Sequence, residues 1–325
     1  MGHPLYVFLD LNHWIYLARQ YHRTCQHKTR SDFASTLLEK VQSNEVRMPL
    51  GIVHFIELLQ NENPARRHRL AEVFEMYSRG WYFASWSDIC DFEVRQALHH
   101  VFDGLSPERP TVFGRGFMFT ASAQGRDIVA KDQTVEFSAF FNAISAQPGA
   151  LFDLLTTTIE VNRKEQKRVG ANLSSANANA SEDLRMRRRA CSREVTRRAQ
   201  HATYILQHEK QLTQQLALMH RSVQDFLALG YERLSRFWSV VPSMDTDCEL
   251  TAYRDRQWSR RVQPNDVKDL AQLAIAVPYC DAVVVEKFWK RAITEAGLAQ
   301  KYRTAVFSNL AELLPYVQSN PTPKW

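Results

Sequence analysis

The sequence has few cysteines, and none in the spacing that metal sites or disulfide frameworks need. Five cysteines are scattered over 325 residues, and no two are separated as in a CxxC pair. The odd number and the wide spacing argue against a disulfide framework and against a structural zinc site. This use of cysteine suits a reducing compartment, so we expect a cytoplasmic protein.

Long hydrophobic runs are also missing. No stretch approaches the roughly 18 uninterrupted apolar residues that indicate a membrane-spanning helix. The opening residues MGHPLYVFLDLNHW carry Asp10 and His13 where a secretory signal needs an apolar core. No internal repeat of the solenoid kind is present. We therefore expect a globular chain without a membrane segment.

The chain is rich in apolar and basic residues. Hydrophobic residues make up 45% of it, with seven tryptophans and eighteen phenylalanines, enough for one large domain or two smaller ones. The net charge is +6 and the sequence pI is about 9.1. Such a charge favours anionic partners, among which nucleic acid is the commonest, although it also serves solubility.

The two ends of the chain alternate between strand and helix patterns. In the first ninety residues, short apolar runs predict strands at 5–9, 45–49 and 81–86, with helical spacing between them. In the last part, strands are predicted at 281–285 and 304–307, and helices at 265–277, 288–296 and 310–317. This alternation predicts an α/β fold with a central parallel sheet flanked by helices.

The middle of the chain has mainly helical periodicity and many basic residues. Its stretch 170–181 (GANLSSANANAS) is small and polar and predicts a loop or hinge. We therefore expect a discontinuous α/β domain formed by residues 1–90 and 260–325. Residues 91–259 would form a mainly helical, basic insertion.

Several carboxylates accompany the predicted strands. Asp10 directly follows the first strand, at the end where open parallel sheets carry their functional crevice. Glu57 lies among apolar residues in GIVHFIELLQ, on the helix after the second strand. Carboxylates brought close together repel each other unless a cation neutralises them, and oxygen ligands suit Mg²⁺ or Mn²⁺.

The late segment PNDVKDLAQLAIAVPYCDAVVVEKFW supplies further acids. Asp266 and Asp269 lie one helical turn apart, Asp281 opens the apolar strand, and Glu286 closes it. In order and spacing, these acids and those of the N-terminal part resemble the PIN-like nuclease domain, over residues 4–90 and 260–320. The family more usually has Asp at the position of Glu286.

The resemblance implies a metal-dependent endonuclease. Asp10, Glu57, Asp269 and Glu286 would correspond to the residues that bind Mg²⁺ or Mn²⁺, with Asp281 close by. A metal-bound water would then hydrolyse a phosphodiester bond, without a serine or cysteine nucleophile. RNA is expected rather than DNA by family analogy, as is a role as a toxin or defence effector. A homo-oligomer or a regulatory protein partner is left open.

Each acid also has a structural interpretation. Asp10 would serve as a helix N-cap, Glu57 as an ion-pair partner of an arginine, and Glu286 as a solvated residue. Asp266 is better explained by the positive end of a helix, and Asp281 by the start of a strand.

Nearby polar residues are weaker candidates. We expect His54, on the face of Glu57, to be packed and hydrogen-bonded rather than a ligand. Asn12 and His13 are candidates for polar residues that support the site, as are Ser308 and Asn309.

Two other functions compete with the nuclease. A catalytically silent PIN-like module that binds RNA or another protein would keep the fold without metal-dependent cleavage. A haloacid-dehalogenase-like phosphatase would also place an aspartate after the first strand, but Asn12 stands where its second aspartate is needed. A deoxyribonuclease is a further, less favoured alternative.

A row of arginines marks the basic middle region. Seven arginines and one acid, Glu194, lie between residues 185 and 198. On one helix, every fourth residue would form a stripe able to follow a nucleic-acid backbone, composed of Arg185, Arg189, Arg193 and Arg197. Tyr204, Phe237 and Trp238 would be stacking groups if exposed, but core positions suit them better. The alternative interpretation of the stripe is a solvent-exposed helix face without a ligand.

Overall fold

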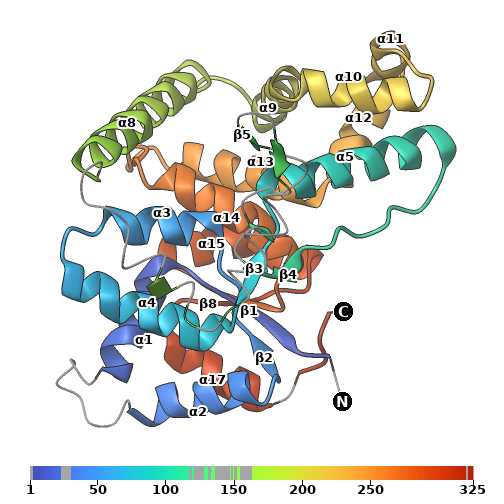
Figure 1. Ribbon diagram of the computed structural model, residues 1–325. Coiled ribbons are helices and arrows are strands. Elements are labelled where there is room, and N and C mark those ends of the chain that lie inside the picture. The colour runs from blue at the N-terminus through green and yellow to red at the C-terminus, as the bar shows by residue number, and fades with distance from the viewer. Residues whose placement is uncertain are drawn as a thin grey trace. The chain divides into compact units, whose positions relative to one another are not determined.

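The computed structural model describes most of the chain. Residues 3–22, 31–116, 163–319 and 321–324 are described, with short pieces at 119–120, 128–130, 133–135, 147, 149 and 152–153. The chain divides into two compact units (Figure 1). The first unit comprises residues 1–85, 112–170 and 279–325, and the second comprises residues 86–111 and 171–278.

A parallel sheet at the centre of the first unit joins the two ends of the chain. Its four strands are β1 (Leu5–Leu9), β2 (Val46–Arg47), β7 (Ala282–Val284) and β8 (Ala305–Phe307). They follow the order β2-β1-β7-β8, and every neighbouring pair is parallel. The expected α/β fold with a parallel sheet flanked by helices is therefore confirmed at this level.

Alternation along the strands builds the core of this unit. Val7 and Leu9 of β1 are fully buried on one face with Val284 of β7. Phe8 points to the other face, where its ring lies 6.0 Å from that of Phe83. Each large apolar side chain buried in this way contributes about 1.5–3 kcal/mol to folding.

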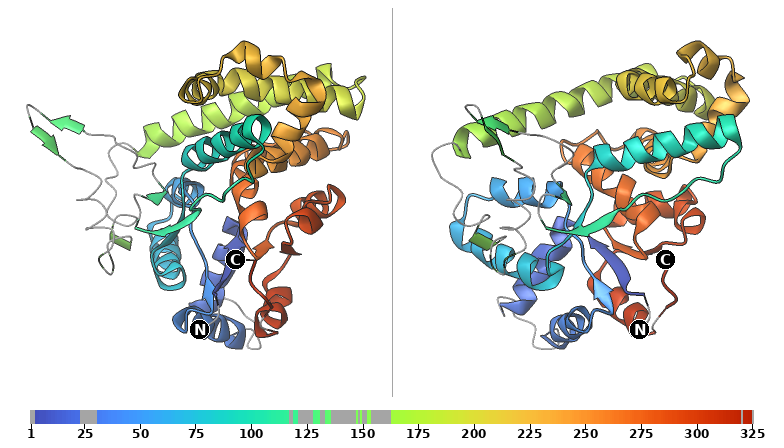
Figure 2. Two further views of the ribbon diagram at one scale, coloured as in Figure 1. Left: turned by 90° about the vertical axis from the view of Figure 1, so that its right-hand side faces the viewer. Right: turned by 45° about the vertical axis from the view of Figure 1, so that its right-hand side comes forward.

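Helices complete the first unit around the sheet (Figure 2). Trp14, Leu37 and Leu313 are completely buried and pack in the same core as β1. The helices are α1 (Leu11–Tyr21), α2 (Ser31–Gln42), α3 (Ile52–Gln60), α4 (Pro64–Ser78), α15 (Lys287–Glu295), α16 (Leu298–Lys301) and α17 (Leu310–Gln318).

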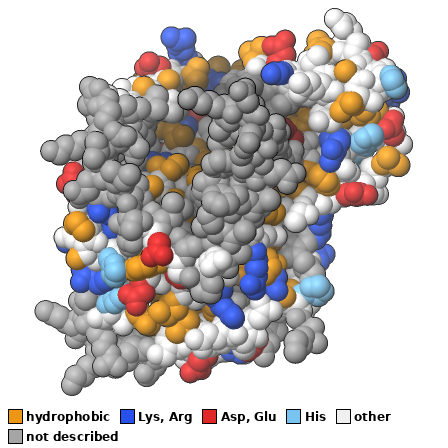
Figure 3. Space-filling view, viewed as in Figure 1, with side chains coloured by type: hydrophobic (Ala, Val, Ile, Leu, Met, Phe, Trp, Pro, Cys, Tyr) orange, Lys and Arg blue, Asp and Glu red, His pale blue; other side chains and the backbone are white. Residues whose placement is uncertain are grey.

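A second pair of strands contains an aromatic and basic cluster. Antiparallel β3 (Trp81–Phe83) and β4 (Phe113–Arg115) pair with each other, and Tyr82 also bridges Leu50 in parallel. The guanidinium of Arg47 lies 3.9 Å from the centre of the Trp81 ring, and that of Arg115 lies 5.1 Å from it. Lys and Arg side chains gather in this region on the face seen in Figure 3. β5 (Ile128–Ala130) and β6 (Gln133–Val135) form a separate antiparallel pair.

The second unit consists of helices and connections in its described residues. Its core includes Leu98, Leu216, Phe226, Phe237 and Met244 from five helices. The helices are α5 (Trp86–Asp103), α8 (Arg163–Arg187), α9 (Arg193–Gln207), α10 (Glu209–Leu218), α11 (Val223–Leu227), α12 (Gly230–Ser239), α13 (Pro242–Asp255) and α14 (Asp266–Tyr279). Residues 163–170 of α8 and the last residue of α14, Tyr279, are counted with the first unit.

The unit boundaries differ from those expected. Residues 112–170 belong with the first unit, in which β4 pairs with β3. Residues 260–278 belong with the second unit, in which Val267 and Leu270 line a cavity with other residues of that unit. The helical periodicity of residues 135–155 predicts a helix there; Val135 instead ends β6, and the rest of this stretch lies almost entirely outside the described residues.

Two local predictions in the middle of the chain are wrong. The stretch 170–181 is helical and lies inside α8, because its alanines favour helix and it contains no proline. The arginine row does not lie on one helix, because α8 ends at Arg187 and α9 begins at Arg193. Ser192 caps α9 by accepting a hydrogen bond from the Val195 amide at 3.3 Å.

Among the described residues, no helix is both long enough and apolar enough to cross a membrane.

Candidate functional site

The candidate site lies at the carboxyl ends of β1 and β7. These strands are neighbours, yet the chain continues from β1 to β2 on one side and from β7 to β8 on the other. The strand order thus reverses between them, and ligands of open α/β sheets bind outside the strand ends at such a switch point. Asp10 directly follows β1, and Glu286 lies two residues beyond β7.

Asp10 links the end of β1 to the start of α1. Its backbone amide donates to the Val284 carbonyl at 3.1 Å, which extends the pairing of β1 with β7. Its Oδ1 accepts a hydrogen bond from the His13 amide at 3.1 Å. Asp10 is therefore the N-cap of α1, a role that contributes about 1 kcal/mol in proteins. The structural interpretation of this residue is correct, and it does not exclude a second role for the carboxylate.

Glu286 approaches Asp10 from the other strand. It precedes α15, but its side chain does not cap that helix. Its Oε1 instead accepts a hydrogen bond from Nδ2 of Asn12 at 2.6 Å. Asn12 was among the polar residues expected to support the site, and this contact places it there.

The pKa of Asp10 reflects this environment. Burial raises it above its usual value, and the negative charge of Glu286 raises it further. His13 and the backbone amides of His13 and Glu286 act in the opposite direction. The carboxylate of Glu286 is therefore close enough to act on that of Asp10, at the N-termini of α1 and α15.

His54 holds α3 against the end of β1. It is completely buried, its Nε2 lies 2.9 Å from the Leu9 carbonyl, and its Nδ1 accepts a hydrogen bond from the Gly51 amide at 3.0 Å. Because the amide can only donate, Nδ1 must be unprotonated and Nε2 must carry the proton. Burial lowers the pKa of His54 to about 4, so the ring is neutral at physiological pH. His54 is packed and hydrogen-bonded, as expected.

Asp281 does not join this pair. Its Oδ2 accepts a hydrogen bond from the Tyr6 amide at 2.7 Å, and its Oδ1 accepts one from the Lys324 amide at 2.6 Å. Asp281 precedes β7 and Glu286 follows it, so extended chain of about 3.3 Å per residue separates them. The expectation of a metal ligand at Asp281 is corrected: the residue ties the C-terminal segment to the amino end of the sheet.

The remaining acids have separate settings. Glu57 is half-buried on α3, one turn beyond His54, and Asp269 is half-buried on α14 in the second unit. Asp266 is buried and accepts hydrogen bonds from Arg260 at 2.7 Å and from the Gln263 amide at 2.8 Å. The helix-terminal interpretation of Asp266 thus agrees with its position.

The described residues were compared with the metal cluster that the resemblance implies. In the described part of the chain, no three His, Cys, Asp or Glu side chains come together in an arrangement that could hold a metal ion. Of the acids that the resemblance implies as ligands, Asp10 and Glu286 form a pair in which the charge of Glu286 acts on Asp10.

Arg185 serves the packing of the second unit. Its side chain is buried and donates to the carbonyls of Asp255 at 3.1 Å, Gln257 at 3.1 Å and Arg260 at 2.7 Å. It also pairs with Glu182 at 2.9 Å. Its expected role in a nucleic-acid-binding stripe is corrected, because its donors are occupied by the protein itself.

The other arginines of the row have different surroundings. Arg193 and Arg197 both approach Glu249, at 2.9 Å and 3.7 Å. Arg189 is exposed, and its guanidinium lies 5.4 Å from the centre of the Trp258 ring. The three aromatic residues considered for stacking are buried in the core, as their alternative interpretation predicted: Tyr204, Phe237 and Trp238.

Comparison with protein-family models, with curated proteins and with solved structures finds no match to this chain. The resemblance therefore gains no support from relatives. The functional interpretation rests on the geometry at the carboxyl ends of β1 and β7. That geometry contains a half-buried carboxylate, a second carboxylate that accepts a hydrogen bond from the Asn12 amide group, and two helix N-termini.

Proposed function

We propose that the protein is a metal-dependent endonuclease that acts on RNA, and that Asp10 and Glu286 hold its Mg²⁺ or Mn²⁺. The observation that carries this proposal is the meeting of the two carboxylates at the switch point of the parallel sheet. They come from opposite ends of the chain. Neither the helix cap at Asp10 nor the contact of Glu286 with Asn12 requires a second carboxylate nearby.

A single hard cation suits this pair. Mg²⁺ keeps several of its waters and is commonly held by one or two carboxylates together with substrate phosphates. A divalent charge would offset the repulsion between Asp10 and Glu286. When bound, the ion supplies a water of lowered pKa for attack on phosphorus.

The protein would position the carboxylates around this ion and provide a positive electrostatic potential for the substrate. The N-termini of α1 and α15 both lie at the pair, and their partial positive charge favours a phosphate. Asn12 fixes the carboxylate of Glu286, and His54 fixes the strand end that carries Asp10. Glu57 and Asp269 stay predictions of the resemblance alone.

The net charge of +6 supports a polyanionic substrate. The basic and aromatic cluster of Arg47, Trp81 and Arg115 offers this charge on the first unit itself. The choice of RNA over DNA rests on family analogy.

Cleavage assays with isosteric variants test the proposal. Asp10→Asn retains a good N-cap residue, and Glu286→Gln retains an oxygen that can accept from Asn12. Both variants should fold and fail to cleave labelled RNA with Mn²⁺, while the wild-type protein cleaves it. Glu295→Gln, on the exposed surface of the same helix α15, is the matched control and should cleave normally.

The substrate arms use RNA, single-stranded DNA and duplex DNA, each with and without Mn²⁺. Cleavage of DNA alone would refute the RNA assignment. Equal cleavage by wild type, Asp10→Asn and Glu286→Gln would refute the site.

A catalytically silent module is the second candidate. The lack of a three-residue metal cluster in the described part of the chain favours it. It predicts RNA binding without cleavage, and binding that is unchanged when Mn²⁺ is removed by a chelator.

A further inference from the structure

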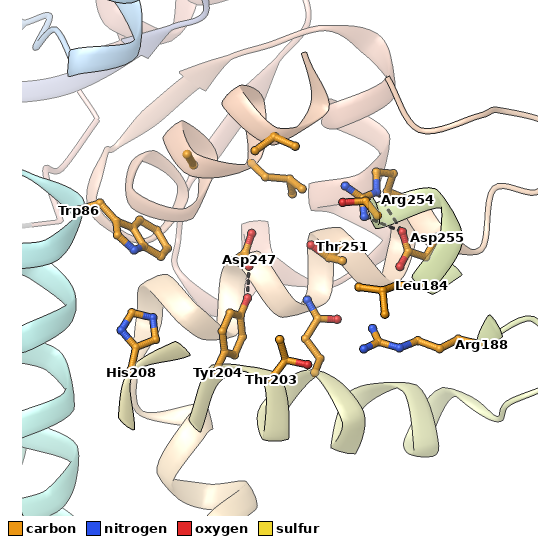
Figure 4. A pocket seen from close by; sticks show the side chains of 15 residues that line it. Trp86, Leu184, Arg188, Thr203, Tyr204, His208, Asp247, Thr251, Arg254 and Asp255 are labelled. Atoms are coloured by element: carbon orange, nitrogen blue, oxygen red, sulfur yellow. Dashed lines mark hydrogen bonds and ion pairs between the residues drawn. The ribbon is translucent and has the colours of Figure 1, made fainter. Parts of the chain in front are cut away.

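The second unit contains an elongated cavity of about 380 Å³. Residues of α5, α9, α13 and α14, together with the C-terminal part of α8, line it. Figure 4 shows Trp86 and His208 at one end, Asp247 and Thr251 in the middle, and Arg188 toward the other end. This volume lies within the range typical of small-molecule sites, roughly 300–1,000 Å³.

The end at Trp86 suits a flat ring. Trp86 is half-buried at the start of α5, and the His208 ring lies on the same side of the cavity (Figure 4). An indole and an imidazole form a surface on which an aromatic ligand stacks without a specific hydrogen bond. Leu270 and Ala271 of α14 add apolar surface to the lining of the cavity.

The middle of the cavity holds a carboxylate. Asp247 accepts a hydrogen bond from the hydroxyl of Tyr204. Burial raises the pKa of Asp247 to about 6, Arg254 acts in the opposite direction, and Asp255 raises it. At neutral pH the group is therefore mostly ionised and accepts hydrogen bonds. The N–H groups on the edge of a nucleobase are donors of the kind that such a carboxylate recognises.

The far end of the cavity is basic. Arg254 is paired with Asp255 at 2.7 Å, whereas Arg188 acts on the same carboxylate only through its charge. Arg188 and Asp255 also line a second, smaller cavity of about 110 Å³. The two cavities therefore adjoin at this pair of residues.

The smaller cavity is surrounded by arginines. Besides Arg188, it is lined by Arg185, Arg189, Arg193 and Arg256. Arg189 and Arg256 are exposed and have no carboxylate partner among the described residues. Guanidinium groups that are not neutralised by the protein are suited to bind phosphate.

We propose that the second unit binds a nucleotide, with its base between Trp86 and Asp247 and its phosphate at Arg188 and the adjoining arginines. The cavity has a stacking surface, a hydrogen-bond acceptor and a cationic end in that order. These would bind the face of a base, the N–H groups on its edge and the phosphate of a nucleotide. A free nucleotide and one nucleotide of an RNA strand share this chemistry. The site lies wholly within the second unit and does not depend on the metal pair of the sheet.

Calorimetric titration of the full chain tests this site. The probes are the four ribonucleoside 5′-monophosphates, the corresponding nucleosides, inorganic phosphate and a short single-stranded oligoribonucleotide. At least one monophosphate or the oligoribonucleotide should bind. The corresponding nucleoside and inorganic phosphate should each bind at least about tenfold more weakly than this ligand. Binding of monophosphates identifies a free nucleotide, and binding of the oligoribonucleotide alone identifies a strand.

Variants assign the binding to the cavity. Trp86→Ala and Arg188→Gln should each weaken it about tenfold. Asp247→Asn keeps the shape of the side chain and should also weaken it, which covers the case in which Trp86→Ala fails to fold. Arg233→Gln removes an exposed arginine of α12 outside both cavities and should leave binding unchanged.

Two results would overturn the proposal. One is the absence of binding by every monophosphate and by the oligoribonucleotide. The other is binding that Arg188→Gln and Asp247→Asn leave as strong as in the wild-type protein, with both variants shown to be folded by circular dichroism.

Discussion

Acidification should destabilise the protein through His54, and the structure sets the size of the effect. The ring is completely buried among the rings of Phe8, Trp14 and Phe74, and its two nitrogens are engaged by backbone groups. Its pKa falls from an ordinary 6.5 to about 4 in the folded state. Below its ordinary pKa, the unfolded chain therefore binds a proton that the folded chain does not.

The sign follows from this difference in bound protons. The free energy of unfolding is unaffected by His54 above a pH of about 6.5, and it decreases as the pH falls from there toward about 4. The complete loss amounts to about 3 kcal/mol, of which about 2 kcal/mol is lost by a pH of about 5. Protonation would also oppose the hydrogen bond that Nδ1 accepts from Gly51.

Urea unfolding followed by tryptophan fluorescence at neutral and acidic pH measures this loss. His54→Gln removes the titrating group and keeps a donor and an acceptor. It should be less stable than the wild type at neutral pH, because one backbone partner loses its hydrogen bond. Its further loss on acidification should be about 2 kcal/mol smaller than that of the wild type. His201, whose pKa is also lowered to about 4, is common to both proteins and cancels. Equal losses in the two proteins would refute the role assigned to His54.

Three further substitutions test other contacts. Asp281→Ala leaves two backbone amides, including that of Tyr6, without their acceptor, so the free energy of unfolding should fall by about 1–3 kcal/mol, and cleavage per folded molecule should be unchanged. The lysine in Arg185→Lys cannot reproduce three separate hydrogen bonds to carbonyls, so the melting temperature of the second unit, measured by calorimetry, should drop. An unchanged melting temperature would contradict the packing role of Arg185. Asn12→Ala removes the hydrogen bond that holds the carboxylate of Glu286, so the rate of RNA cleavage should fall about 10- to 100-fold with the fold retained. An unaltered rate would show that this hydrogen bond does not support cleavage.

The strands and helices of the first unit could be predicted because their signals are local. The apolar run Leu5–Leu9 followed by Asp10 predicts a strand and a helix start, and both are present. The segment Ala282–Val284 likewise forms the predicted buried strand. The pairing of these two segments followed from the general rule that alternating strands and helices form one parallel sheet.

The roles of single charged residues could not be predicted in the same way. Asp281 and Glu286 flank one short strand, and the parallel pairing of that strand with β1 shows that Glu286, and not Asp281, lies at the end that carries Asp10. Arg185 occurs in a basic run, but its buried contacts come from residues about 70 positions later in the chain. The row of arginines also spans the end of α8 and the start of α9. Ser192, the N-cap of α9, is the residue in the sequence that indicates this helix start.

The cavity of the second unit was missed for a related reason. Trp86 and Asp247 are far apart in sequence, and neither belongs to a motif of fixed spacing. The sequence predicts a strand that ends at Trp86, whereas Trp86 begins α5. Long-range packing of helices, rather than any local pattern, brings these side chains to one cavity.

The central claim is that Asp10 and Glu286 together hold a divalent cation that is needed to cleave RNA. The rate of RNA cleavage as a function of Mn²⁺ concentration, in the wild type and in Glu286→Gln, tests it most directly. We predict that the folded variant cleaves at least about 100-fold more slowly at any given Mn²⁺ concentration and needs more Mn²⁺ to reach half its maximal rate. The same rate and the same Mn²⁺ dependence in both proteins would contradict the claim.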